Sequence, residues 1–182
     1  QQQPAGLGHA VWCARHLIGN DPVAVLLADD LILGESCVRE MAEAYDGGNM
    51  VAVMDVPFDQ TDAYGIVTPG DDDGRIVNVR GLVEKPKPAE APSTIAVVGR
   101  YIIAPDVFAT LDSHERGAGG EIQLTDALAK QIGKAPFKGL RFSGERFDCG
   151  SKLGFLQANI AFGLENGELE TDLRNWMVGR LS

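Results

Sequence analysis

The sequence predicts a three-layer α/β fold in which helices cover the faces of a mixed β-sheet. Residues 22–28 form a continuous apolar run, typical of a strand in an α/β sheet, and an amphipathic helix and a second apolar strand follow. Shorter strands joined by a tight turn then occupy residues 66–83, as in an antiparallel hairpin. A strand–helix–strand unit and a hairpin in one chain indicate a mixed α/β sheet. In such sheets ligands bind at the carboxyl ends of the strands, so we expect the site there.

The expected elements are placed by apolar spacing and by glycine and proline breaks. Helices are expected at residues 7–18, 38–45, 105–111, 121–132, 153–164 and 169–181. Strands are expected at residues 22–28, 50–56, 66–67, 76–83, 95–103, 137–142 and 146–147. The run at residues 22–28 does not alternate, so we expect that strand to be buried on both faces in the middle of the sheet.

Length and charge limit the classes of function. A chain of 182 residues, 45% of them hydrophobic, can bury one sizeable core, so we expect a single domain over residues 1–182. Its 26 acidic residues exceed its 16 basic ones, which argues against a protein that grips nucleic acid or an anionic membrane. An anionic substrate would therefore need local basic residues or a metal. No apolar stretch has the length of a membrane span, and the first residues do not resemble a secretory signal.

The cysteines and histidines show no metal-binding or disulfide pattern. The three cysteines are too few and too dispersed for a disulfide framework, which favours a reducing cytoplasm; they are Cys13, Cys37 and Cys149. The histidines lack the spacing of a ligand pair on a helix; they are His9, His16 and His114. Any metal is therefore expected on carboxylates.

Two aspartates follow expected strands and are candidate ligands of Mg²⁺. Asp29 comes after the strand at residues 22–28, and Asp148 comes after Arg146 and Phe147. A hard cation commonly takes one or two carboxylates together with substrate phosphates. The alternative is structural: Asp29 caps the segment that follows it, and Asp148 makes a turn with Gly150.

A second candidate lies at the end of the hairpin. Glu84 and Lys85 place an acceptor beside a cation at a strand end, where Pro86 stops further pairing, and they suit a sugar hydroxyl and a phosphate. Gly65 allows a backbone to approach a ligand closely. An adjacent Glu and Lys are more often a solvated pair, and a plain turn explains Gly65 equally well. His9 is expected to be a satisfied helix residue rather than a base.

Seven short motifs, taken in order, resemble the bacterial UTP–glucose-1-phosphate uridylyltransferases, a branch of the nucleotidyltransferase family. They are GLGHAV at 6–11, LLADDLIL at 26–33, AYGIV at 63–67, VEKPK at 83–87, VGRYI at 98–102, GGEIQLTDA at 119–127 and DCGSKLGF at 148–155. The resemblance covers nearly the whole chain and implies the Rossmann-like mixed sheet of the nucleotide-diphospho-sugar transferases. GLGHA and DCGSKLG are similar to the uridylyl branch, whereas the related thymidylyltransferases share the aspartate and EKP motifs.

The resemblance also implies a role for each matching residue. Asp29 and Asp148 would bind Mg²⁺, and Glu84 and Lys85 would hold the glucose hydroxyls and the sugar phosphate. The remaining substrate contacts would come from Gln1 and Gly6 at the uracil, Gly65 at the sugar and Lys152 at a phosphate. The implied reaction joins UTP and glucose 1-phosphate into UDP-glucose and pyrophosphate, in a homodimer or homotetramer to which the apolar closing helices of residues 151–182 contribute.

Two departures from the family pattern matter. Ala28 stands where relatives usually have proline. The family's first strand and its GxGTR loop, which cradles the triphosphate, match nothing here, so we expect an N-terminally incomplete fold and leave open whether this chain is active alone. The alternatives are a non-catalytic module that binds sugar nucleotides, and a related enzyme that uses dTTP or another sugar 1-phosphate.

Overall fold

The computed structural model describes residues 1–181, which form two compact units. Unit 1 contains Gln1–Leu26 and Val38–Phe142, and unit 2 contains Leu27–Cys37 and the described residues after Phe142. Each unit is built from two separate stretches of the chain. The expected single domain over residues 1–182 stays a prediction.

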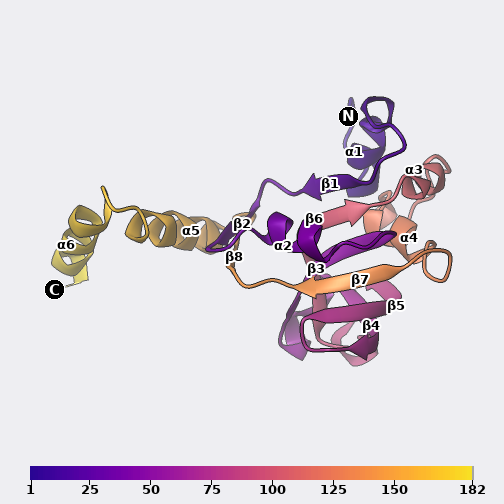
Figure 1. Ribbon diagram of the computed structural model, residues 1–182. Coiled ribbons are helices and arrows are strands. Elements are labelled where there is room, and N and C mark those ends of the chain that lie inside the picture. The colour runs from indigo at the N-terminus through magenta and orange to yellow at the C-terminus, as the bar shows by residue number, and fades with distance from the viewer. Residues whose placement is uncertain (182) are drawn as a thin grey trace. The chain divides into compact units, whose positions relative to one another are not determined.

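Unit 1 is built on a six-stranded mixed sheet in the order β1-β6-β3-β7-β5-β4 (Figure 1). Its strands are β1 (Val23–Leu26), β3 (Asn49–Asp55), β4 (Gly65–Asp72), β5 (Ile76–Glu84), β6 (Ile95–Ile103) and β7 (Phe137–Arg141). The β3–β7 pair is parallel, and the other pairs are antiparallel. The expectation of a mixed sheet in an α/β fold is therefore confirmed.

The expectation that residues 22–28 form a central strand is wrong. Among the described strands β1 pairs only with β6, so it lies at the edge of the sheet. Its residues alternate between half-buried and exposed, and Leu26 is 51% exposed. A continuous apolar run does not reveal how many neighbours a strand has, because pairing is decided by distant parts of the chain.

The core of unit 1 lies along β3 and β6, where nearly every residue is buried. Buried residues on these two strands include Met50, Val51, Val53 and Ile103, and Leu140 of β7 is also fully buried. A strand buried on both faces needs a covering layer on each side. The helices of this unit are α1 (Leu7–Cys13), α2 (Cys37–Ala44), α3 (Asp106–Leu111) and α4 (Leu124–Ala129).

Two helices are shorter than their apolar spacing predicts. α1 ends at Cys13, and a single 3-10 turn at Arg15–Leu17 replaces the expected continuation to residue 18. α4 begins at Leu124 rather than at residue 121 because the preceding segment pairs with the chain before α1. Ile122 N–H donates to Ala5 O, and Gly8 N–H donates to Ile122 O, both at 2.8 Å. This pairing fixes the start of α1 against the start of α4.

Unit 2 is smaller and joins a two-stranded antiparallel sheet to two helices. Its elements are β2 (Asp30–Leu33), β8 (Glu145–Asp148), α5 (Lys152–Leu164) and α6 (Glu170–Leu181). Ser151 caps α5, since its Oγ accepts a 2.9 Å hydrogen bond from Gly154 N–H. Asp30 of β2 is a diagonal neighbour of Arg146 of β8, and the two side chains form an ion pair that is largely buried. Within residues 1–181 no helix combines the length and apolarity needed to cross a membrane.

Candidate functional site

Asp29 and Asp148 lie together in unit 2, although 119 positions of the chain separate them in sequence. The antiparallel pairing of β2 with β8 sets Asp30 opposite Asp148, and Cys149 N–H donates to Asp29 O at 2.7 Å. A β-carbon added to Gly150 would lie 3.0 Å from Asp148 Oδ1 and 3.4 Å from Asp29 Oδ2. Both carboxylates therefore face the same backbone position.

The donor set at this position fits a hard divalent cation. Both side chains are exposed, so they have room for water or phosphate oxygens beside them. Asp148 Oδ1 also accepts a 2.9 Å hydrogen bond from Gly150 N–H, as in the structural alternative for this residue, and its second oxygen is not occupied by that turn. Among residues 1–181 no three acidic, histidine or cysteine side chains gather into a complete protein cage. Two carboxylates suit Mg²⁺, which retains water and phosphate ligands.

Lys152 follows the aspartate pair in the same unit. It is the first residue of α5 and is exposed, four residues after Asp148. The Ser151 cap holds the beginning of this helix, and the Lys152 backbone is fixed with it. The lysine therefore presents a cation from an ordered helix start.

Gly65 and Glu84 form the second group of candidate residues, in unit 1. The β4–β5 hairpin pairs them directly. A β-carbon on Gly65 would lie 3.2 Å from Glu84 Oε2 and 3.4 Å from Thr125 Oγ1, so a side chain here would crowd both groups. Glycine thus leaves the space beside the carboxylate open. The half-buried Glu84 and the buried Thr125 provide a carboxylate and a hydroxyl at this strand end.

Lys85 adopts a backbone conformation that is uncommon for a residue with a side chain. Its φ angle is 46°, in the left-handed region, and it precedes Pro86, which also disfavours helical angles. Lys85 N–H donates to Tyr64 O at 2.9 Å, which holds the turn. Strained residues of this kind concentrate at functional sites, and Lys85 is exposed.

Gln1, Gly6 and His9 form a third group at the start of α1. Gln1 Nε2 lies 2.9 Å from Gly6 O and 3.0 Å from His9 Nδ1. Gly6 has a φ of 106°, and a β-carbon on it would come within 2.6 Å of Ile122 O, so only glycine fits there. The N–H of Gly8 is not available to a ligand here, because it donates to Ile122 O.

Two residues near these groups were missed as functional candidates. Thr125 belongs to the GGEIQLTDA motif but had no assigned role, and it lies against Gly65 only because α4 packs on β5. His9 was expected to be a satisfied helix residue, and Gln1 and Cys13 both lie within reach of its ring. The i, i+4 spacing of His9 and Cys13 is visible in the sequence, but the contact with Gln1 depends on how the chain turns before α1.

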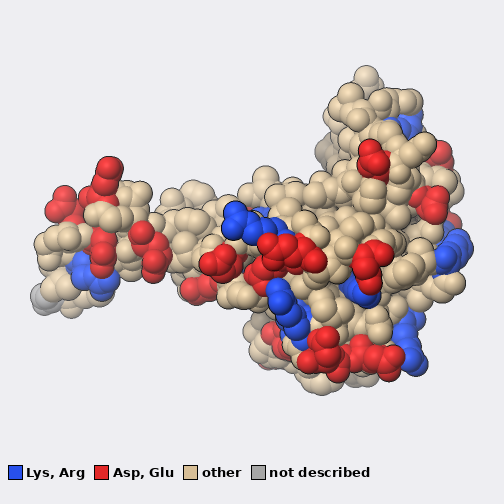
Figure 2. All heavy atoms as spheres, in the orientation of Figure 1, with Lys and Arg blue, Asp and Glu red and all other residues tan. Residues whose placement is uncertain are grey.

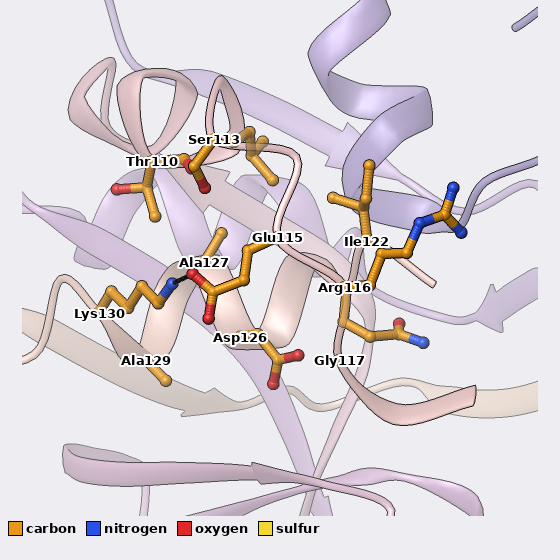
Figure 3. Close-up of a pocket in the computed structure, with 12 residues that line it drawn as sticks. Thr110, Ser113, Glu115, Arg116, Gly117, Ile122, Asp126, Ala127, Ala129 and Lys130 are labelled. Carbon is orange, nitrogen blue, oxygen red and sulfur yellow. Dashed lines mark hydrogen bonds and ion pairs between the residues drawn. The ribbon is translucent and has the colours of Figure 1, made fainter. Parts of the chain in front are cut away.

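A pocket of about 380 Å³ lies on unit 1 between α3 and α4, away from the candidate residues (Figure 3). Figure 3 shows the Glu115 carboxylate pointing at the Lys130 ammonium, with which it forms an ion pair. Asp126 also lines the pocket, where burial raises the pKa of its carboxyl group despite the opposing effect of Lys130. The pocket shares Ile122 with the contact to α1.

Charge over the surface agrees with the acidic composition. On the face shown in Figure 2, acidic side chains are scattered in many places with basic side chains between them, and no continuous basic stripe crosses that face. The net charge of −10 comes from the same imbalance.

Comparison with known proteins adds sequence and structural relatives. Residues 1–162 match the family described as Nucleotidyl transferase. A UTP–glucose-1-phosphate uridylyltransferase from Komagataeibacter xylinus is 52% identical over 176 residues, which are 95% of this chain and 60% of that protein. The chain thus spans less than two thirds of that relative's length.

Two solved structures are similar in fold and in sequence. A UDP-glucose pyrophosphorylase complexed with UDP-glucose superposes with a TM-score of 0.86 at 37% identity, covering 91% of this chain and 65% of the other. A UTP-bound UGPase from Acinetobacter baumannii gives a TM-score of 0.83 at 35% identity, covering 97% and 62%. The mixed α/β sheet described above is the fold that these structures share with this chain.

Proposed function

The chain belongs to the nucleotidyl transferase family, and we propose that it is part of a uridylyltransferase, an enzyme that forms UDP-glucose and pyrophosphate from UTP and glucose 1-phosphate. The observation that carries this proposal is the meeting of Asp29 and Asp148 beside Gly150. Two exposed carboxylates that share one position suit a cation between phosphates better than they suit a structural role. The relative from K. xylinus and the complex with UDP-glucose support the choice of substrates.

The residues of unit 1 would bind the organic parts of both substrates. Gln1 and Gly6 would contact the uracil edge, and Gly65 would offer its backbone to the glucose. Glu84 would accept hydrogen bonds from the sugar hydroxyls, since an ionised carboxylate is a strong acceptor. Lys85 would hold the phosphate of glucose 1-phosphate as a compact positive charge.

The residues of unit 2 would help to neutralise the negative charge of the phosphates. Asp29 and Asp148 would hold Mg²⁺, which offsets charge on phosphate oxygens when it is bound. Lys152 would contribute a further positive charge to a phosphate. These groups act by position and charge, which is the main source of catalysis in phosphoryl and nucleotidyl transfer.

The reaction itself would need no protein nucleophile. A phosphate oxygen of glucose 1-phosphate attacks the α-phosphorus of UTP, a new P–O bond forms, and the bond to the bridging oxygen of the β-phosphate breaks. Pyrophosphate leaves with that oxygen. The protein's task is to hold the attacking oxygen in line with the leaving group, which removes much of the entropic barrier.

Replacing Asp29 with alanine in the full-length gene product tests the proposal. We expect Asp29→Ala to lower kcat/KM at least about a hundredfold in a pyrophosphate-release assay, because a metal carboxylate contributes several kcal/mol. Asp29 is exposed, so the midpoint of thermal unfolding should hardly change. Glu35→Ala, which removes another exposed carboxylate of unit 2, serves as the control. Activity like the wild type in Asp29→Ala would refute the metal assignment.

The same assay separates the alternative functions. UDP-glucose binding without release of pyrophosphate from the wild-type protein would indicate a non-catalytic module. Faster turnover with dTTP than with UTP, or with another sugar 1-phosphate, would indicate a related transferase. Turnover fastest with UTP and glucose 1-phosphate is the expected result.

We also propose a homo-oligomer, a homodimer or homotetramer, in a reducing cytoplasm. Apolar side chains on α5 and α6 are more than half exposed; they include Leu153, Phe155, Leu156, Trp176 and Val178. Such a surface supports association. The three cysteines, Cys13, Cys37 and Cys149, are free thiols, in keeping with a reducing compartment. Sedimentation of the full-length protein measures its assembly state.

A further inference from the structure

The side-chain amide of Gln1 is held by two acceptors at the start of α1. Its nitrogen lies 2.9 Å from Gly6 O and 3.0 Å from His9 Nδ1. A backbone carbonyl oxygen can only accept a hydrogen bond, so the amide atom that faces Gly6 O must be the donor Nε2. The contact with Gly6 O therefore fixes the orientation of the Gln1 amide, although Oε1 and Nε2 have nearly the same shape.

This orientation determines the state of the His9 ring. Because Nε2 of Gln1 is a donor, His9 Nδ1 must accept, so it carries a lone pair and the ring proton lies on its Nε2. His9 Nε2 in turn faces Cys13 Sγ at 3.8 Å, and a thiol sulfur accepts weakly. Both hydrogens of the Gln1 amide nitrogen are then used, one by Gly6 and one by His9.

Gln1 thus has one polar atom left for a ligand. Its Oε1 makes no hydrogen bond within residues 1–181, and the residue is exposed. An amide locked in this way presents an acceptor and no donor. Uracil carries an N–H donor at N3, whereas the N3 of cytosine is an acceptor. If Gln1 Oε1 faces the N3 of cytosine, two acceptors meet and neither gains a hydrogen bond, which costs binding free energy.

We propose that His9 is a specificity-determining residue, which locks the Gln1 amide so that Oε1 selects a pyrimidine with an N3–H donor over cytosine. This inference rests on the proposed contact of Gln1 with the base. In this inference His9 acts through Gln1, so it is a positioning residue. Without its acceptor, the amide keeps one anchor at Gly6 and gains freedom to turn.

The surroundings of His9 keep its ring in place. Trp12 stacks on it with the ring centroids 5.7 Å apart, and His114 meets it edge-on at 5.8 Å. A planar ring at position 9 therefore has stacking partners whether or not it carries nitrogen.

Three variants of the full-length protein test the role of His9. His9→Phe keeps a ring for Trp12 and removes the acceptor, whereas His9→Asn places an amide oxygen near the position of Nδ1. His16→Phe is the matched control, because His16 is exposed and lies outside this cluster. For each protein, kcat and KM are measured with UTP and with CTP, at constant glucose 1-phosphate and magnesium.

We expect His9→Phe to lower the UTP to CTP ratio of kcat/KM about tenfold, mainly through a higher KM for UTP. His9→Asn and His16→Phe should keep the ratio of the wild type.

The outcomes separate this inference from the proposed function. An unchanged ratio in a folded His9→Phe protein that turns over UTP would overturn the role of His9 and leave the uridylyltransferase intact. No turnover of UTP by the wild type would overturn the proposed function and the inference with it. If His9→Phe does not fold, His9→Leu, which also lacks a ring acceptor, is measured in the same way, and an unchanged ratio of kcat/KM in that variant contradicts the role of His9.

Discussion

The two units of the molecule are stabilised in different ways. Unit 1 buries almost every residue of β3 and β6 between layers of side chains. In the described part of unit 2, the buried hydrophobic residues are Cys37, Phe147 and Ala158. A two-stranded sheet with so small a core is marginal by itself, so polar contacts carry more of its local order.

The large buried core is in unit 1, whereas the charged candidate residues for metal and phosphate binding include three in unit 2. Asp29, Asp148 and Lys152 are exposed residues of unit 2, at strand ends and at a helix start. Their positions depend on the β2–β8 pairing and on the turn at Gly150 rather than on a deep core. A substitution in the core of unit 1 should therefore affect stability first, whereas one at the aspartates should affect chemistry first.

The largest effect on stability is expected in the centre of unit 1. Leu140 of β7 is fully buried, and Leu140→Ala should lower the free energy of unfolding by about 3 kcal/mol, because it removes apolar contacts and leaves a cavity. Leu156→Ala in α5 is the matched control, since Leu156 is 59% exposed. Urea denaturation measures both variants, and equal losses would contradict the contrast between the units.

A smaller effect is expected at the ion pair of unit 2. The side chains of Arg146 and Asp30 are only 12% and 7% exposed, so Arg146→Ala deprives a buried carboxylate of its cation. We expect a loss of about 2 kcal/mol, and a weaker β2–β8 pairing should also raise the magnesium concentration needed for activity. Hydrogen exchange of the β2 and β8 amides reports the change locally.

The control for this prediction is a surface ion pair of the same unit. Arg174 and Glu170 are 3.0 Å apart on α6, with both side chains about half exposed. Arg174→Ala should change stability by less than about 0.5 kcal/mol, because exposed pairs contribute little. A loss as large as that of Arg146→Ala would show that burial of the pair is not what matters.

Local pattern predicted most elements of this fold, and long-range pairing accounts for the misses. The hairpin at residues 66–83 and the helix after Cys37 follow from turn residues and apolar spacing, which neighbours in sequence determine. The edge position of β1 was missed because it depends on β6, more than 70 positions later. The late start of α4 was missed because it depends on pairing with Ala5 and Gly8.

The candidate site also divides into residues that the sequence motifs predict and contacts that only the folded chain shows. Motif order was enough to propose Asp29, Asp148, Glu84 and Lys85, and the structure brings the two aspartates together at Gly150. The contacts of Thr125 with Gly65 and of His9 with Gln1 were not predictable, because each joins segments that meet only in the folded chain. No sequence periodicity reports a contact of this kind.

The smallest effects concern two carboxylates of unit 1 with opposite pKa shifts. Burial raises the pKa of Asp126, so its contribution to stability is greatest below the unfolded-state pKa and declines as the pH rises through the folded-state value. Hydrogen bonds from the Arg141 guanidinium, and a further one from Gly74 N–H, lower the pKa of Asp72. Its contribution is present above the unfolded-state pKa and is lost as the pH falls through the folded-state value.

Replacing each carboxylate with its neutral amide should therefore change stability in opposite directions at about pH 7. Asp126→Asn removes a charge that burial disfavours, and we expect the free energy of unfolding to rise only slightly, because solvent screens this partly exposed group. Asp72→Asn weakens the contact with Arg141 and should lower stability, although part of that contact is exposed and screened. Urea denaturation at about pH 7 and about pH 4 measures both variants. Because its raised pKa lets Asp126 take up a proton as the pH falls to about 4, the effect of Asp126→Asn should shrink at the lower pH. The lowered pKa keeps Asp72 ionised there, so the effect of Asp72→Asn should largely persist. Changes of equal sign at neutral pH would mean that burial of Asp126 does not govern its charge.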